Sequence, residues 1–196
     1  MSRPSALVEV AEISPGFSIP GAIQHDPSGK YQLILPRHLD GGGRPFVYNE
    51  ERHAMRMALP ARADAYLVRP GDVLFVSRGD RNRAVAIHDC PEKTVVPTTF
   101  FVLRPRGGIF SDYLAWYLNQ VPAQGAITQI RTGAGTPMVQ RAKFGELSIV
   151  VPPIERQQRI AHLGALMLAE QELVDRLAAV VARRSRLIGR RLIENS

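Results

Sequence analysis

The sequence predicts an α+β fold with a mixed or antiparallel sheet and few helices, followed by one long C-terminal helix that pairs in a coiled coil. Three observations lead to this prediction. Before the Pro152–Pro153 pair, short apolar runs alternate with turn residues, which is typical of strands. One helical pattern interrupts these runs, at residues 112–119. After Pro153 the strand pattern stops, and residues 154–196 contain no proline and only two glycines. We therefore divide the chain into a domain of residues 1–153 and a helix of residues 154–196.

The elements of the first domain follow from its apolar runs and from the turn residues between them. A helix is expected over residues 112–119, with Ser111 as its N-terminal cap. A loop is expected over residues 132–137 and a helical turn over residues 140–144. The expected strands are residues 7–13, 30–35, 65–68, 73–79, 84–89, 98–106 and 147–151.

Apolar residues repeat every seven positions along residues 154–196, which is the pattern of a coiled-coil helix. Such a helix would extend about 60 Å, farther than a domain of this size can cover. A projecting helix with a continuous apolar stripe is only marginally stable alone in water. We therefore expect a partner helix, from a second copy of the chain or from another protein. The alternative is that the helix folds back on its own domain. The residues expected to form the dimer interface are Ile160, Leu163, Met167, Val174, Leu177, Val181 and Ile188, and Leu166, Leu173, Val180 and Leu187 widen the stripe.

Composition and cysteine content bound the class of protein. Hydrophobic residues make up 45% and charged residues 22% of the 196 residues, as in folded globular proteins. No apolar run is long enough to span a bilayer, and the N-terminal residues lack the apolar core of a signal peptide. The single cysteine, Cys90, excludes an internal disulfide and a cysteine-based zinc site. We expect a cytoplasmic protein that does not act on a membrane.

The charge balance favours a polyanionic partner. The chain has 25 basic and 18 acidic residues, for a net charge of +7, and proteins of this kind are often nucleic-acid binders. Of the basic residues 22 are arginine, whose planar guanidinium pairs bidentately with phosphate or with a guanine edge. The alternative is a GC-rich genome, which raises arginine content through codon usage alone.

Motifs for catalysis are absent from the sequence. There is no G-x-x-x-x-G-K-[ST] phosphate loop, no H-E-x-x-H and no G-x-S-x-G. The glycine-rich stretches 41–43 and 133–135 lack the strand–G-x-G-x-x-G–helix order of a nucleotide site, and the five histidines lack the spacing of metal ligands. Asp89, Glu92 and Lys93 lie in an apparent turn whose compactness does not fit a magnesium-dependent nuclease centre. We therefore expect no catalytic residue, no metal site and no cofactor on this chain.

Two polar loops remain as candidates for binding DNA. Residues 77–83 place three arginines and an asparagine on a tight turn, and residues 128–144 contain no acidic residue. The alternative for each is an ordinary solvated loop. A third loop, with His25, Lys30, Arg37, His38 and Arg44, is a weaker candidate. The residues expected to face DNA, through bases or phosphates, are Arg78, Arg81, Asn82, Arg83, Arg131, Thr132, Gln140, Arg141 and Lys143.

Stretches distributed over nearly the whole chain have the order found in one known family. They are residues 7–16, 34–36, 70–79, 95–103, 112–118, 133–138 and 147–160. Together they resemble the specificity subunits of type I restriction-modification systems. The stretch LSIVVPPIERQQRIAHL, residues 147–163, looks like the junction between a target recognition domain and a spacer helix. Arg156 departs from the glutamine of the family's E-Q-x-x-I pattern, or Gln157 serves after a one-residue insertion.

The resemblance implies what the chain does and with whom. It implies a target recognition domain that reads double-stranded DNA through its loops, and helices that pair antiparallel as a spacer. It also implies a methyltransferase subunit that clasps the helices and carries the S-adenosylmethionine, so that this cofactor is expected on the partner. A full family member has two recognition domains and two helices, whereas this chain has one of each. We therefore expect a half-length form that homodimerises on a bipartite palindromic target; a restriction subunit is a further candidate partner.

Two other functions stay open at this point. One is an assembly adaptor or regulator of a defence operon, which docks a methyltransferase through its helix without reading DNA. The other is an enzyme in its own right, which the missing motifs disfavour. Binding to the partner but not to DNA would identify the adaptor, and turnover by the purified chain alone would identify the enzyme.

Overall fold

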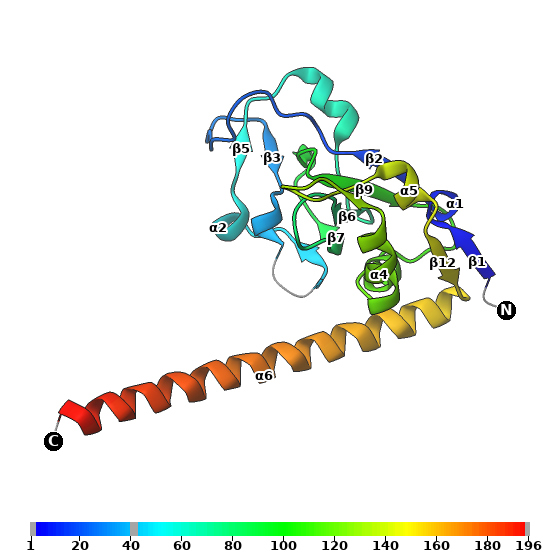
Figure 1. The fold of residues 1–196 in the computed structure, drawn as a ribbon. Helices are drawn as coiled ribbons and strands as arrows, with labels where there is room; N and C mark the ends of the chain where they lie inside the picture. Colours follow the sequence, from blue (N-terminus) through cyan, green and yellow to red (C-terminus); the bar gives the residue numbers. More distant parts are fainter. Residues whose placement is uncertain (1–2, 40–42, 195–196) are drawn as a thin grey trace.

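The computed structural model describes residues 3–39 and 43–194, which form a globular part and a projecting helix (Figure 1). A five-stranded sheet is the centre of the globular part. All neighbouring strands in it are antiparallel except the last pair, which is parallel, so the sheet is mixed. The strand order is β2 (Ala11–Pro15), β9 (Phe100–Pro105), β6 (Val73–Val76), β7 (Ala84–Asp89) and β4 (Phe46–Val47).

Smaller sheets and short helices surround the central sheet. A three-stranded sheet has the order β5 (Arg56–Met57), β3 (Tyr31–Leu33) and β8 (Thr94–Val95). Two antiparallel pairs join β1 (Arg3–Ala6) to β12 (Ser148–Val151), and β10 (Arg131–Thr132) to β11 (Met138–Val139). The helices are α1 (Leu7–Val10), α2 (Glu50–His53), α3 (Ser111–Leu118), α4 (Val121–Gln129), α5 (Arg141–Gly145) and α6 (Ile154–Glu194), with 3₁₀ turns at Pro36–His38 and Ala61–Tyr66.

Strand β6 is buried on both faces of the sheet because its alternate side chains enter two different cores. Val73 and Phe75 join a core that includes residues of α3, α4 and α5, and Phe75 stacks on Phe144 with ring centroids 4.3 Å apart. Leu74 and Val76 pack on the other face of the sheet. An apolar run without alternation is therefore what a central strand covered on both sides requires.

Helix α6 is the long helix that the sequence predicts, and it confirms the predicted fold class. It starts at Ile154, directly after Pro153, and its first turns pack against α3. A Cβ atom on Gly164 would lie 2.2 Å from Cδ1 of Trp116, so only glycine allows α6 to approach α3 this closely. Contact continues as far as Glu172, which lies 2.6 Å from Arg44, and the rest of α6 extends away from the globular part (Figure 1). Only the first part of α6 therefore packs on its own domain. The pairing of α6 in a coiled coil stays a prediction.

The junction between the globular part and α6 is held by a fully buried glutamine. The Nε2 atom of Gln157 donates to the carbonyl oxygens of Gly108 at 2.7 Å and of Pro152 at 2.8 Å, and its Oε1 accepts from the Phe110 amide at 2.9 Å. Arg156 is exposed. Of the two residues considered for the glutamine position of the junction pattern, Gln157 is thus the one built into the structure.

Three sequence-based element predictions are wrong. Leu7–Val10 forms a helical turn in place of the first part of strand 7–13, because Leu7 and Val10, three residues apart, both point into the core. Residues 65–68 form no strand; Ala61–Tyr66 is a 3₁₀ turn in which Asp64 accepts a hydrogen bond from the Tyr31 hydroxyl. Ser111 is the first residue of α3 and not its cap, which is Phe110.

The sequence pattern predicts no helix where α4 forms, so the globular part has more helices than expected. Pro122 lies in its first turn, where a missing amide hydrogen costs nothing, and this position was the available signal. The expected strand at 147–151 and the helical turn at 140–144 are present as β12 and α5.

Candidate nucleic-acid interface

The two polar loops that the sequence singles out lie side by side. The first, residues 77–83, connects β6 to β7. The second, residues 128–144, contains the end of α4, the β10–β11 hairpin of residues 131–139 and most of α5. Val139 donates its amide hydrogen to Ser77 O at 2.8 Å, and Gly79 donates to Pro137 O at 2.9 Å. We call residues 77–83 and 131–139 the loop pair. Main-chain hydrogen bonds therefore fix two segments of distant sequence as one surface.

Within the first loop, exposure divides the predicted residues. Arg78 and Arg81 are exposed, and Gly79 has a φ of +96°, which sets the turn between them. Asn82 is buried, and its Nδ2 donates to Val76 O at 2.8 Å. The prediction that the Asn82 side chain faces outward is wrong, because the turn uses this amide to satisfy a main-chain carbonyl. Arg83 is half-buried and donates to Leu39 O at 3.3 Å.

Within the second loop, Arg131 joins the two segments. Its side chain is 20% exposed, and Nη2 donates to Gly79 O at 3.3 Å and lies 3.8 Å from the exposed carboxylate of Asp80. Thr132 is exposed, with its hydroxyl 3.4 Å from Met138 O. Arg131 thus holds the loops in position, and Thr132 presents its side chain at the hairpin.

A hollow of about 310 Å³ lies where the two loops meet. The loop pair has four arginines and one acidic residue, Asp80, so its net charge is +3. Asp80, Thr136 and Met138 are not among the predicted residues. Asp80 could have been found from its place in the arginine-rich loop, directly after Arg78 and Gly79. Thr136 and Met138 reach the hollow only because the β10–β11 hairpin forms, which the sequence does not predict. The hollow is lined by Arg78, Thr132, Gly133, Thr136 and Met138.

Three predicted residues lie beyond the loop pair. Gln140 follows β11 and is half-buried, whereas Arg141 and Lys143 are exposed on α5. Helix α5 packs against α1. Whether these side chains contact DNA stays a prediction separate from that for the loop pair.

The third, weaker candidate loop does not form a site. His38 is buried, and its Nδ1 accepts from the Leu35 amide at 3.3 Å. Burial, with the charges of Arg37 and His53, lowers the pKa of His38 to about 4. Arg44 instead reaches α6 and lies 2.6 Å from Glu172. His25 accepts from the Arg56 amide at 3.1 Å, and Arg37 lies 3.7 Å from Met55 Sδ. Four of the five residues therefore have contacts within the chain.

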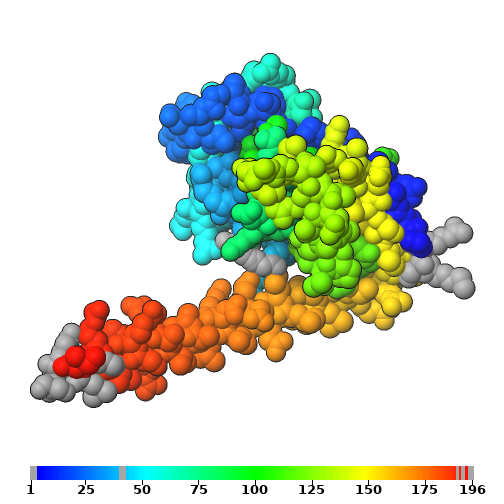
Figure 2. Space-filling model, viewed as in Figure 1, coloured from blue at the N-terminus to red at the C-terminus, as the bar shows by residue number. Residues whose placement is uncertain are grey.

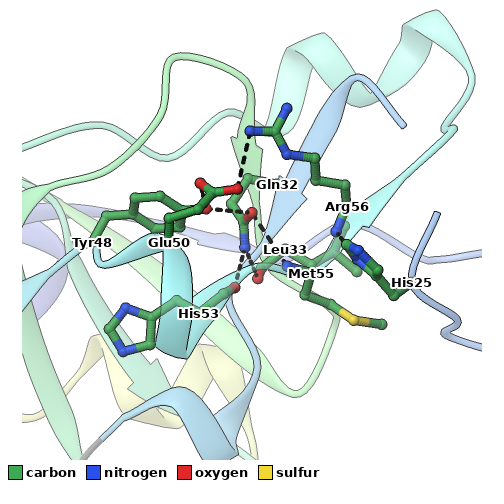
Figure 3. Close-up of polar contacts among 8 residues, drawn as sticks. All are labelled: His25, Gln32, Leu33, Tyr48, Glu50, His53, Met55 and Arg56. Atoms are coloured by element: carbon green, nitrogen blue, oxygen red, sulfur yellow. Dashed lines mark hydrogen bonds and ion pairs between the residues drawn. The ribbon is translucent and has the colours of Figure 1, made fainter. Parts of the chain in front are cut away.

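A polar network beside this loop holds the three-stranded sheet to α2 (Figure 3). Gln32 is buried; its Nε2 donates to Leu33 O at 2.8 Å and to His53 O at 2.6 Å. The Tyr48 hydroxyl lies 3.1 Å from Gln32 Oε1 and 2.6 Å from Glu50 Oε2. Burial and the Glu50 hydrogen bond raise the pKa of Tyr48 to about 12. Because its polar atoms are satisfied within the chain, we assign this network a structural role.

Within residues 3–39 and 43–194, no three His, Cys, Asp or Glu side chains gather in a way that could hold a metal ion. In the same residues, no helix has both the length and the apolar character to cross a bilayer.

Comparison with known proteins gives matches among solved structures alone. No protein-family model matches the chain, and no curated protein matches it either. A structure from work on complex assembly and conformational transition of the type I R-M system aligns with a TM-score of 0.69 and 20% identity, over 95% of this chain and 43% of that chain. The fold is that of type I S subunits.

Two further structures agree with this result. The type I restriction-modification S subunit from M. genitalium aligns over 94% of this chain and 43% of its own, with a TM-score of 0.57 and 12% identity. The HsdS subunit from Thermoanaerobacter tengcongensis aligns over 87% of this chain and 38% of its own, with a TM-score of 0.55 and 19% identity. The chain thus spans less than half the length of the structures that it matches.

Proposed function

We propose that this chain is a non-catalytic DNA-recognition subunit of a type I-like restriction-modification system. The observation that carries the proposal is the loop pair, a surface of net charge +3 on a domain with the fold of S subunits. Positive charge attracts the phosphate backbone, and side chains held on rigid loops can read base edges. The similarity in fold to type I S subunits adds support.

The contacts of the loop pair suggest separate roles for its arginines. Arg78 and Arg81 are exposed and able to reach a base edge or a phosphate. Arg131 is engaged with Gly79 and Asp80, so we assign it to positioning the two loops. A bidentate base contact would contribute about 1 to 3 kcal/mol of discrimination, whereas a phosphate contact would change the salt dependence of binding by about one unit of slope.

Helix α6 is the expected site for partner subunits. We propose that α6 pairs with α6 of a second copy, so that two recognition domains face a bipartite, palindromic DNA target. A methyltransferase subunit would dock on the paired helices and supply S-adenosylmethionine and the methyl transfer. A restriction subunit is a further candidate partner, and the cytoplasm is the expected location. The exposed apolar stripe of α6 supports the helix partner.

The proposal is tested by selecting bound duplexes from a random library and measuring affinity for the enriched sequence by fluorescence anisotropy. We expect the double variant Arg78→Ala/Arg81→Ala to bind more weakly and to reduce the salt slope by about two units if both arginines contact phosphates. The matched control is Arg69→Ala/Arg106→Ala, which removes the same charge at the opposite end of β6 and β9. It should leave the sequence preference unchanged.

Two outcomes would contradict the proposal. Equal effects of both double variants would mean that net charge, and not the loop pair, binds DNA. No enrichment of any duplex, together with binding to a methyltransferase, would favour the adaptor function. The exposed stripe of α6 is compatible with that function as well.

A further inference from the structure

The apolar stripe of α6 points away from the globular part. Gln157, Ala161, Gly164 and Leu168 form the side that packs on the globular part. Successive residues of a helix turn by about 100°, which puts the heptad positions of the stripe on the opposite side. Leu163 is accordingly 58% exposed, although it lies level with the globular part. In Figure 2 the second half of α6 stands clear of the globular part. The stripe is thus accessible to another helix from Leu163 to Ile188.

The two halves of α6 carry opposite charge. Residues 163–175 contain three acidic residues and no lysine or arginine. Residues 176–190 contain five arginines and no acidic residue. Two such helices attract one another when they run in opposite directions and repel when they run in the same direction.

The stripe is also symmetric about one residue, Leu177. In an antiparallel pair centred there, each residue faces the one at the same distance on the other side of position 177 in the second copy. Every apolar stripe residue between 166 and 188 then faces an apolar residue. These pairs are Leu166 with Ile188, Met167 with Leu187, Leu173 with Val181, Val174 with Val180, and Leu177 with itself.

The two charged residues within this stripe complete the symmetry. Glu170 and Arg184 stand at heptad positions between apolar neighbours, and both are exposed. They lie seven residues before and seven residues after Leu177, so each faces the other across the pair. A charged residue at a core position of a coiled coil fixes register and orientation.

We propose that two copies of this chain pair their α6 helices antiparallel, in the register centred on Leu177, with reciprocal Glu170–Arg184 ion pairs in the seam. This inference rests on the homodimer of the proposed function and on the antiparallel pairing that the resemblance implies, and it adds the register and the ion pairs. A parallel pair in register would instead place Glu170 against Glu170 and Arg184 against Arg184. The antiparallel register avoids both contacts and pairs each apolar stripe residue between 166 and 188 with another apolar residue.

The register also sets the distance between the two globular parts. Each packs on its own α6 near Gly164, which lies 13 residues before Leu177. At 1.5 Å per residue, the two packing points are about 39 Å apart along the helix pair. Because each globular part lies on the side of α6 opposite the stripe, it does not obstruct the partner helix.

Cysteine cross-linking tests the register in the full chain. The background is Cys90→Ser, since Cys90 is the only natural cysteine. We expect Leu177→Cys to form an intermolecular disulfide under mild oxidation, because position 177 faces itself. Ile188→Cys, the matched control on the same stripe, should not cross-link alone. It should cross-link when mixed with Leu166→Cys, the residue that it faces.

The outcomes separate failure of the register from failure of the homodimer. Cross-linking of both Leu177→Cys and Ile188→Cys alone would indicate a parallel pair, which overturns the register and leaves the homodimer in place. A monomeric mass by light scattering at all concentrations would overturn the register and the homodimer together. Neither result would bear on DNA recognition, which the duplex selection tests by itself.

Charge reversal tests the ion pairs. In a dimer of Glu170→Arg, each introduced arginine would face Arg184 of the other copy. In a dimer of Arg184→Glu, each introduced glutamate would face Glu170 of the other copy. We expect each to raise the dimer dissociation constant about tenfold, and the double variant to restore it. The control Asp175→Arg makes the same change of charge outside the stripe and should have a smaller effect. If the double variant dimerises no better than the single ones, the proposed pairing is wrong.

Discussion

The globular part and the projecting half of α6 use the same residue types in opposite ways. Leu114 and Leu118 of α3 are fully buried, whereas Leu173 and Leu177 of α6 are 64% and 65% exposed. Full burial of a leucine side chain contributes about 1.5 to 3 kcal/mol. The globular part obtains this stabilisation within one chain, and the projecting half of α6 can obtain it only from a partner. Its apolar residues therefore report on assembly, and those of the globular part report on folding.

The largest difference in unfolding free energy is expected between two leucine truncations, one in each region. Leu114→Ala leaves a cavity between α3 and the central sheet and should lower the free energy of unfolding by about 4 kcal/mol. Leu177→Ala removes an exposed side chain and should change the stability of the globular part by less than about 0.5 kcal/mol, while weakening the dimer. Urea unfolding followed by the fluorescence of Trp116, the only tryptophan, measures the first effect, and light scattering measures the second.

The contrast between the regions fails if both leucines behave alike. A loss of several kcal/mol from Leu177→Ala at a concentration where the chain is monomeric would mean that the projecting half of α6 packs on its own globular part. Loss of dimerisation in Leu114→Ala, with the fold intact, would mean that the globular part forms the dimer interface.

The sequence predicted best the elements whose pattern is long or strongly apolar. Helix α6 shows a heptad repeat over many turns, β6 is a continuous run of apolar residues, and β9 begins with four of them. Short elements were missed because their pattern is ambiguous. The Leu7–Val10 turn fits both a strand and a helix, and α4 has few apolar residues, with Val121 exposed at its start. In such segments tertiary contacts decide the local structure.

For the candidate site, the sequence indicated which loops matter but not how each side chain is used. Arg78 and Arg81 are exposed as expected. Asn82 is a polar residue of the same loop, yet its side-chain amide donates a hydrogen bond to Val76 O inside the chain. The contact between residues 77–79 and 137–139 joins segments about 60 residues apart and has no local signature, so it required the structure.

Acid should act on the globular part through His38. Burial, first, and the charges of Arg37 and His53 lower its pKa from 6.5 to about 4 in the folded chain. Unfolded chains bind this proton near pH 6.5 and the folded chain only near pH 4, so stability is intact above pH 6.5 and falls as the pH drops toward 4. The loss over this window is about 3 kcal/mol. Urea unfolding at a series of pH values measures it.

A histidine on α6 is the matched control for this effect. His162 is exposed, and His162→Gln makes the same substitution outside the globular part. His38→Gln should flatten it between pH 6.5 and 4, because the glutamine is neutral at both ends of the window and its oxygen can accept from the Leu35 amide. An unchanged pH dependence in His38→Gln would show that another group causes the acid sensitivity.

The smallest of these effects is expected at the junction, where the two regions meet. Gln157→Ala would leave the Phe110 amide and the carbonyl oxygens of Gly108 and Pro152 without their buried partner. We expect a loss of about 2 kcal/mol, while the exposed neighbour Arg156→Ala should cost less than about 0.5 kcal/mol. If Gln157 also fixes the direction in which α6 leaves the globular part, small-angle scattering of the folded variant will show a changed overall dimension. An unchanged scattering curve with reduced stability would mean that contacts farther along α6, such as Gly164 against Trp116, set that direction instead.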